Sequence, residues 1–85
     1  MAEQLETERQ IEGLVEIFRA VLPPAPIDAE SDFFDLGGHS VLAGRVVARA
    51  QEQLDIPVSM RDVFTARTPR AIVEAVNARA SLTRG

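Results

Sequence analysis

The stretch that decides how this 85-residue chain folds is Asp32-Phe33-Phe34-Asp35-Leu36-Gly37-Gly38-His39-Ser40. Its paired glycines break regular structure, because glycine adopts backbone conformations that other residues avoid. Behind them, apolar residues recur with helical spacing, which predicts a helix from His39 or Ser40 to about Leu54. The apolar arc of this helix contains Leu42, Ala43, Val46, Val47, Ala50 and Leu54. Ser40 lies near the edge of that arc, at the start of the helix, where another protein can reach it.

Three further helices are predicted around this stretch. Capping-box spacing from Thr7, followed by a single apolar stripe, predicts a helix over about residues 8–22. The same spacing from Ser59 predicts a short helix, and Thr68-Pro69 predicts the start of the last one. Because the sequence shows no alternating strand pattern and no internal repeat, we expect an all-α, four-helix bundle of three longer helices and one short one.

The predicted loop at residues 23–39 is longer than most connections in compact domains, and such loops are usually functional or disordered. Its apolar residues are expected to pin it to the core, which argues against disorder. These residues are Ile27, Phe33, Phe34 and Leu36.

The composition excludes several classes of protein. It is 46% hydrophobic and 26% charged, which is ordinary for a folded domain and too apolar for a disordered chain. No apolar run reaches the ~20 residues of a membrane span, and the N-terminus lacks the apolar stretch of a secretory signal. With no cysteine and one histidine, a disulfide framework and a cysteine metal site are excluded. We therefore expect one cytoplasmic, metal-free domain over residues 1–85, with a helical core at about 8–80.

The charge distribution argues against nucleic acid as a partner. The net charge is −4, whereas nucleic-acid-binding proteins need a basic stripe that displaces counterions from phosphates. Acidic side chains are in excess over residues 1–66, and arginine is in excess only over residues 67–85. We expect neither a nucleic-acid partner nor a membrane partner.

Ser40 is the candidate functional residue. A phosphate ester on its hydroxyl would lie where the helix dipole and unpaired N–H groups stabilise anions. One alternative is that Ser40 is only an N-cap, as serines at helix starts often are. Another is a serine nucleophile, but a G-x-S-x-G elbow would need glycine at the position of Leu42, and the only histidine is the adjacent His39. The sequence therefore argues against a serine hydrolase.

The run from Phe33 to Ala43 resembles the core motif of peptidyl carrier proteins, the thiolation domains of nonribosomal peptide synthesis. The similarity continues through residues 54–58, 61–64 and 68–69 and covers about residues 11–80. It implies a bundle of the acyl-carrier-protein type, with the long loop between the first two helices. It also implies that Ser40 carries a 4′-phosphopantetheine arm through a phosphodiester, with Gly38 and His39 beside the attachment point.

The resemblance further implies which proteins act on the chain. A phosphopantetheinyl transferase would install the arm from coenzyme A with the help of a divalent ion such as magnesium. The thiol of the arm would hold an aminoacyl or peptidyl group as a thioester. The chain would be a monomer without catalytic activity that shuttles this group between an adenylation enzyme and condensation, thioesterase or tailoring enzymes. Met1 and the complete set of helices are typical of a free-standing carrier, and equally of a domain cut from a larger synthetase.

Two rival functions stay open. The first is an acyl carrier protein of polyketide or fatty-acid synthesis. The second helix is not acidic, and His39 stands where those carriers tend to have aspartate, so both features favour the peptidyl class. The second rival is a small helical adaptor without a prosthetic group.

A docking surface for the partners is predicted beside Ser40. Val41 is apolar and lies outside the core arc, so we expect it to form an apolar patch with Met60 and with Val63 or Phe64. Arg45, one turn further along, would meet a carboxylate of a partner. The alternative is that the apolar residues of the short helix are simply core and that the arginine is only solvated.

Two positions depart from the pattern of the family. Gly44 stands where carriers usually have a bulkier residue, and Val41 stands where they more often have leucine. Mid-helix glycine costs about 1 kcal/mol relative to alanine. Either it permits a close approach by a partner, or the bundle tolerates it.

Overall fold

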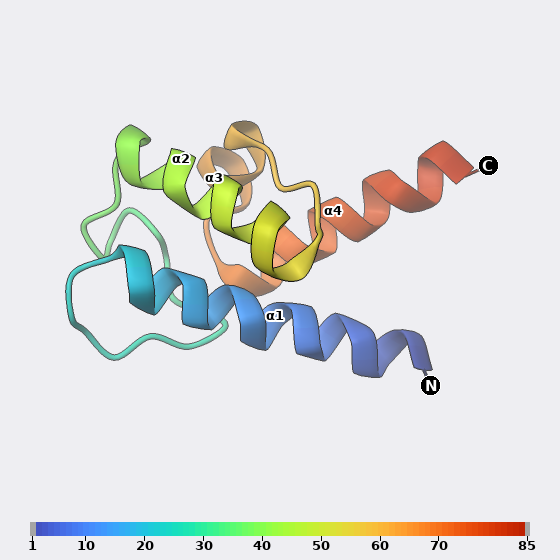
Figure 1. Cartoon of the computed structure of the whole chain (residues 1–85), viewed down its shortest axis with the longest axis horizontal. Helices are drawn as coiled ribbons and strands as arrows, with labels where there is room; N and C mark the ends of the chain where they lie inside the picture. The colour runs from blue at the N-terminus through green and yellow to red at the C-terminus, as the bar shows by residue number, and fades with distance from the viewer. Residues whose placement is uncertain (1, 85) are drawn as a thin grey trace.

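The computed structural model describes the backbone of residues 2–84 and the side chains of residues 5–80. Within residues 2–84 all of its regular secondary structure is helical, without strands (Figure 1). The elements are α1 (Ala2–Val21), α2 (Ser40–Arg49), the π-helical turn η1 (Ala50–Leu54), α3 (Met60–Ala66) and α4 (Pro69–Arg84). The expected all-α bundle of three longer helices and one short one is therefore confirmed. The start of α2 lies at the opposite end of the bundle from both chain termini (Figure 1).

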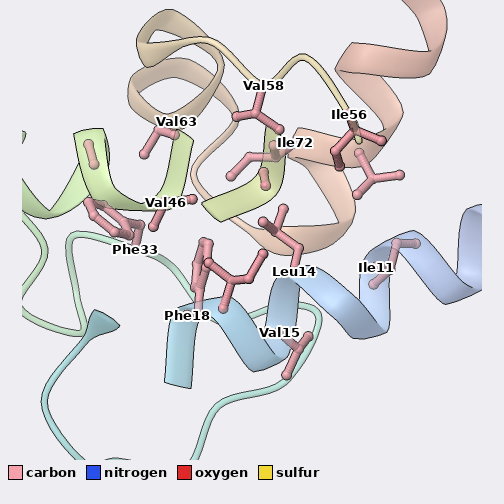
Figure 2. Packing of buried hydrophobic residues seen from close by; sticks show 14 of the residues in the cluster. Ile11, Leu14, Val15, Phe18, Phe33, Val46, Ile56, Val58, Val63 and Ile72 are labelled. Atoms are coloured by element: carbon pink, nitrogen blue, oxygen red, sulfur yellow. The ribbon is translucent and has the colours of Figure 1, made fainter. Parts of the chain in front are cut away.

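The core draws buried side chains from all four α-helices and from the two long connections (Figure 2). At its centre Leu14 and Phe18 of α1 face Val46 of α2 and Ile72 of α4, and all four are fully buried. Ile56 and Val58 bring the segment after η1 into the same cluster. Burying a side chain of this size contributes about 1.5–3 kcal/mol, so this cluster is the main source of stability.

All four phenylalanines of the chain form one series of ring contacts. The Phe33 ring meets the Phe18 ring at 5.5 Å and the Phe34 ring at 5.2 Å between centroids, both edge-to-face. Phe34 in turn stacks on Phe64 of α3 at 5.6 Å, with 19° between the ring planes. Such pairs contribute about 0.5–1.5 kcal/mol beyond burial. They therefore fasten the loop at residues 22–39 to both α1 and α3, as its apolar residues predicted.

The predicted start of the first helix is wrong. Instead of capping a helix at residue 8, Thr7 lies inside α1, which begins at Ala2. The hydroxyl of Thr7 accepts a hydrogen bond from the Asn77 side chain at 3.4 Å, and Gln10 Oε1 accepts another at 3.2 Å. The capping-box spacing thus marks a polar contact between α1 and α4. The helix continues upstream because the residues before Thr7 are good helix formers.

The other predicted helix starts are confirmed. The Ser59 hydroxyl accepts from the Asp62 N–H at 3.1 Å, and the Asp62 carboxylate accepts from the Ser59 N–H at 2.9 Å, a complete capping box. The Thr68 hydroxyl accepts from the Ala71 N–H at 3.1 Å. The helical run from Ser40 also ends at Leu54 as predicted, although its last turn is π-helical.

Candidate functional site

Ser40 is the first residue of α2, and its side chain is exposed. The capping position belongs to His39, whose backbone is extended (φ −152°, ψ −179°) and whose side chain makes no capping hydrogen bond. Within the described residues, the Ser40 hydroxyl makes no hydrogen bond either. The alternative in which Ser40 is only an N-cap therefore does not match this geometry. Its oxygen is free to carry an attached group.

The first turn of α2 presents unpaired backbone N–H groups beside Ser40. The first hydrogen bond of the helix runs from the Ala43 N–H to the His39 carbonyl at 2.8 Å. The N–H groups that precede Ala43 in this turn have no partner inside the helix, as at every helix start. The first turn of α2 also contains no acidic side chain that would neutralise them. A phosphodiester placed here gains about 0.3–1 kcal/mol from the helix dipole.

The two glycines before Ser40 are required for different reasons. Gly37 has φ +95°, in the left-handed region that L side chains rarely adopt. At Gly38, an added Cβ would lie 2.3 Å from the nearest atom of the Phe33 ring. Phe33 is itself fully buried, so the ring has little room to move away. The backbone thus packs directly on the Phe33 ring at Gly38. It then reaches the surface, where His39 and Ser40 are exposed.

Asp32 and Arg67 hold the loop in a way that the sequence analysis missed. Asp32 Oδ1 accepts from the backbone N–H groups of Phe34 at 2.8 Å and of Asp35 at 3.1 Å. Its other oxygen, Oδ2, pairs with Arg67 Nε at 2.9 Å. The Arg67 carbonyl accepts from the Phe33 N–H at 2.8 Å, and its guanidinium lies 5.1 Å from the centroid of the Phe34 ring. No local pattern predicts this contact, because it joins the loop to the end of a distant helix.

The structure divides the predicted docking residues into two groups. Val41 and Phe64 are 64% and 41% exposed, which is unusual for large apolar side chains in this bundle. Val63 is fully buried and points into the core, so its predicted place in the docking patch is wrong (Figure 2). Neighbouring helical residues face different directions, and Val63 is the one that faces inward. Met60 is half-buried against the core, and Arg45 is exposed without an ion pair in the described region.

An ion pair between buried Asp62 and half-exposed Arg79 fixes α3, the helix that carries Phe64, to α4. The two terminal guanidinium nitrogens of Arg79 donate to the Asp62 carboxylate, Nη1 at 2.8 Å and Nη2 at 3.0 Å, and Nη2 also donates to the Pro57 carbonyl at 2.9 Å. Burial alone would raise the pKa of Asp62, but the hydrogen bonds from Arg79 and Ser59 outweigh it and lower the pKa. Asp62 is therefore ionised in the folded bundle at neutral pH.

The site presents an accessible hydroxyl, and among the described residues no base is hydrogen-bonded to it. A serine nucleophile needs a base within hydrogen-bond reach, and no hydrogen bond joins Ser40 to His39 in the described structure. Among the same residues, no group of three or more histidine or acidic side chains is placed to hold a metal ion. No helix in the described range is long and apolar enough to cross a membrane. The arrangement suits an ester on Ser40 that another protein forms.

Comparison with known families agrees with this geometry. Residues 12–76 match the family described as "phosphopantetheine attachment site", and the matched range includes Ser40 and the whole loop before it. Proteins of this family carry a covalently attached 4′-phosphopantetheine. The exposed, unpaired oxygen of Ser40 and the unpaired N–H groups beside it fit the phosphodiester end of such a group.

Two curated relatives are large synthetases. The nonribosomal peptide synthetase agiA of Aspergillus flavus is 45% identical over 56 residues, which are 66% of this chain and 1% of that protein. Phenyloxazoline synthase MbtB of Mycobacterium sp. is 47% identical over 61 residues, which are 71% of this chain and 5% of that protein. The chain thus spans only a small part of the length of these relatives.

Two solved structures share the bundle. BlmI, a type-II acyl-carrier-protein from Streptomyces verticillus involved in bleomycin biosynthesis, has a TM-score of 0.81 and 24% identity over 93% of this chain and 95% of its own. A docking-domain complex of the Pax nonribosomal peptide synthetase has a TM-score of 0.70 and 28% identity over 80% of this chain and 65% of its own. The similarity to BlmI shows the common fold.

Proposed function

The chain belongs to the phosphopantetheine attachment site family, and from this premise we propose that it is a peptidyl carrier protein of nonribosomal peptide synthesis. In this proposal Ser40 carries the 4′-phosphopantetheine arm. The thiol of the arm holds an aminoacyl or peptidyl group as a thioester. The observation that carries the proposal is the exposed, unpaired Ser40 hydroxyl at the first position of α2.

The surrounding residues support the attached phosphate without reacting with it. The unpaired N–H groups of the first turn of α2 face an anion favourably. Gly37 and Gly38 bring the chain out of the core just before Ser40, and the exposed His39 directly precedes the attachment residue. The arm supplies the thiol that the sequence lacks, since the chain contains no cysteine.

The catalytic groups come from partner proteins in this proposal. A phosphopantetheinyl transferase provides the base that activates the Ser40 hydroxyl, with coenzyme A as the donor of the arm. An adenylation enzyme then loads the thiol, and condensation, thioesterase or tailoring enzymes act on the loaded group. The carrier contributes a high effective concentration of the tethered group at each of these active sites.

We assign partner docking to a surface that we call the docking patch and define as the exposed Val41 and Phe64 together with the half-buried Met60. Val41 follows the attachment residue directly, and Phe64 exposes 41% of its surface on α3. Exposed apolar side chains that gather beside a functional residue are typical of interaction surfaces. Arg45 extends this patch by one turn of α2 and is free to meet a carboxylate of a partner.

Intact-mass analysis tests the attachment. The purified apo-protein is incubated with coenzyme A, magnesium and a broad-specificity phosphopantetheinyl transferase. Wild type is expected to gain one phosphopantetheine unit, Ser40→Ala none, and the loop variant Ser31→Ala the same unit as wild type. No gain in wild type, under conditions that modify a known carrier, would leave the helical adaptor as the better interpretation.

Loading of the modified protein separates the peptidyl carrier from the acyl carrier. Thioester formation with an amino-acid adenylation enzyme supports the peptidyl class. Loading only by an acyl ligase or an acyltransferase would instead assign the chain to polyketide or fatty-acid synthesis.

A further inference from the structure

We propose that Arg67 is a positioning residue for partner docking, because it fixes the Phe34 ring that holds the exposed ring of Phe64 in place. The inference rests on the proposed carrier function and adds to it a residue outside the docking patch. In this proposal Arg67 acts on partners through the two rings, while its guanidinium pairs through Nε with Asp32.

The Phe64 ring is both exposed and held. It exposes 41% of its surface, yet it stacks on Phe34 at 5.6 Å with 19° between the planes. A free aromatic side chain loses rotamer freedom when a partner binds it, whereas a ring already fixed in position does not. The stack therefore prepares Phe64 for binding.

Besides its stack on Phe64, the Phe34 ring is held by contacts with two further residues. The edge-to-face contact with the buried Phe33 ring, at 5.2 Å and 88°, fixes it from the core. The Arg67 guanidinium, 5.1 Å from the centroid of the Phe34 ring, fixes it from the solvent side, where 45% of the arginine side chain is exposed. Asp32 keeps this guanidinium in place through an ion pair of 2.9 Å. Removing the arginine would thus take away one of the contacts that restrain Phe34 and leave the rings of Phe33 and Phe64 in contact with it.

The backbone conformation of Arg67 indicates that its side-chain contacts contribute to the structure. Arg67 follows the last turn of α3 as its C-cap and has φ +73°. Glycine is the usual residue at such a left-handed position after a helix, because a Cβ is disfavoured there. Arginine at this position carries a conformational cost that the contacts with Asp32 and Phe34 offset.

The same rings connect this unit to the attachment site. The Phe33 ring packs against Gly38, two residues before Ser40, so that a Cβ at Gly38 would overlap it. The position of Phe64 relative to Ser40 is thus set through consecutive contacts. The transferase is the partner that must touch the Ser40 oxygen itself, so its binding is the most direct measure of this geometry.

The test is a kinetic double-mutant cycle with apo-protein, coenzyme A and a broad-specificity transferase. The variants are Arg67→Gly, Phe64→Ala and the double variant, with Arg70→Ala as the matched control. Arg67→Gly suits the left-handed backbone, so the bundle is expected to fold normally by circular dichroism. Arg70 also ties the loop to α4, through Glu30 at 2.5 Å, but takes part in none of the aromatic contacts.

Binding of the carrier should change while the chemical step does not. Arg67→Gly is expected to raise the KM for the carrier about fivefold, which corresponds to the free energy of one lost cation–π contact, and to leave kcat unchanged. Phe64→Ala is expected to raise KM about tenfold or more, as for a docking anchor. The double variant should equal Phe64→Ala, because Arg67 acts through that ring. Arg70→Ala should match wild type.

A spectroscopic measurement checks the rings directly. In wild type, the aromatic protons of Phe34 and Phe64 should show mutual ring-current shifts, which Arg67→Gly reduces and Arg70→Ala preserves. Arg67→Lys retains the charge but not the planar guanidinium, so its KM should lie between those of wild type and Arg67→Gly.

The outcomes separate this inference from the proposed function. Normal modification of Ser40 together with an unchanged KM in Arg67→Gly overturns the inference alone. Additive effects in the double variant, or unchanged ring-current shifts, overturn it as well. If wild type is not modified at all, the carrier function fails and this inference fails with it.

Discussion

Substitution by alanine should have opposite effects on stability at the glycine before Ser40, Gly38, and at the glycine after it, Gly44. Gly38 precedes the attachment residue by two positions, and Gly44 follows it by one helical turn. A Cβ at Gly38 would meet three atoms of the Phe33 ring, at 2.3, 2.5 and 2.6 Å. A Cβ at Gly44 would meet nothing within 4 Å. We therefore expect Gly38→Ala to destabilise the bundle and Gly44→Ala to stabilise it.

The magnitudes follow from these distances. Real Cβ atoms essentially never approach within 3.0 Å, so at Gly38 the Phe33 ring must shift. That ring is fully buried between Phe18 and Phe34, and overpacking of this kind costs about 1–3 kcal/mol. In the middle of α2, replacing glycine by alanine contributes about 0.5–1 kcal/mol. The two variants should therefore differ in unfolding free energy by about 1.5–4 kcal/mol.

Urea unfolding followed by circular dichroism measures both effects. The midpoints should move in opposite directions with unchanged m-values, since neither variant alters the surface exposed on unfolding. In thermal melts, about 1 kcal/mol corresponds to about 4–8 °C for a domain of this size. A Gly38→Ala protein as stable as wild type would refute the packing of Phe33 against the loop. A destabilised Gly44→Ala protein would show that the glycine is needed inside the bundle.

Two further predictions concern stability. Asp62→Asn should lower the unfolding free energy by about 1–2 kcal/mol at pH 7, because it weakens a charge-assisted pair with the half-exposed Arg79. The folded state lowers the pKa of Asp62 below its usual 3.8. The difference in unfolding free energy between wild type and Asp62→Asn should therefore be constant above about pH 5 and shrink as the pH falls through the folded-state pKa. A pH-independent difference in urea titrations would contradict this prediction. Thr68→Ala should cost about 1 kcal/mol by removing the bond to the Ala71 N–H. Thr65→Ala, which removes only a bond within α3, is its control, and equal midpoints in urea would argue against the cap.

Local signals in the sequence predicted the helices that begin with a cap. Ser59 and Thr68 bond to N–H groups three residues ahead, so all the information lies within four positions. The start of α1 was not predicted correctly, because a hydroxyl with capping-box spacing can also form a hydrogen bond between helices. Thr7 forms such a bond with Asn77. Propensity alone does not decide between these two uses of a threonine.

The exposed surface was harder to predict than the core. In the seven-residue helix α3, adjacent Val63 and Phe64 are both apolar, and periodicity over two turns does not decide which of them faces inward. The orientation of the two residues depends on the loop, because Phe64 stacks on the ring of Phe34 there. The ion pair of Asp32 with Arg67 could not be predicted either, because only the folded loop brings these two residues together.

A carrier must combine a rigid support with an attachment point that stays open to many partners, and separate residues meet these two demands here. Phe33 is fully buried and fixes the path of the loop, whereas Ser40 is exposed and makes no hydrogen bond among the described residues. Substitutions at Gly38 should therefore change stability first, and substitutions at Val41 should change partner binding first. Arg67 belongs to neither group alone, because its backbone ends α3 while its side chain restrains a ring beside the docking patch. A residue of this kind should change the affinity for partners at a small cost in folding free energy, which is why its effect on KM, rather than on melting temperature, is decisive.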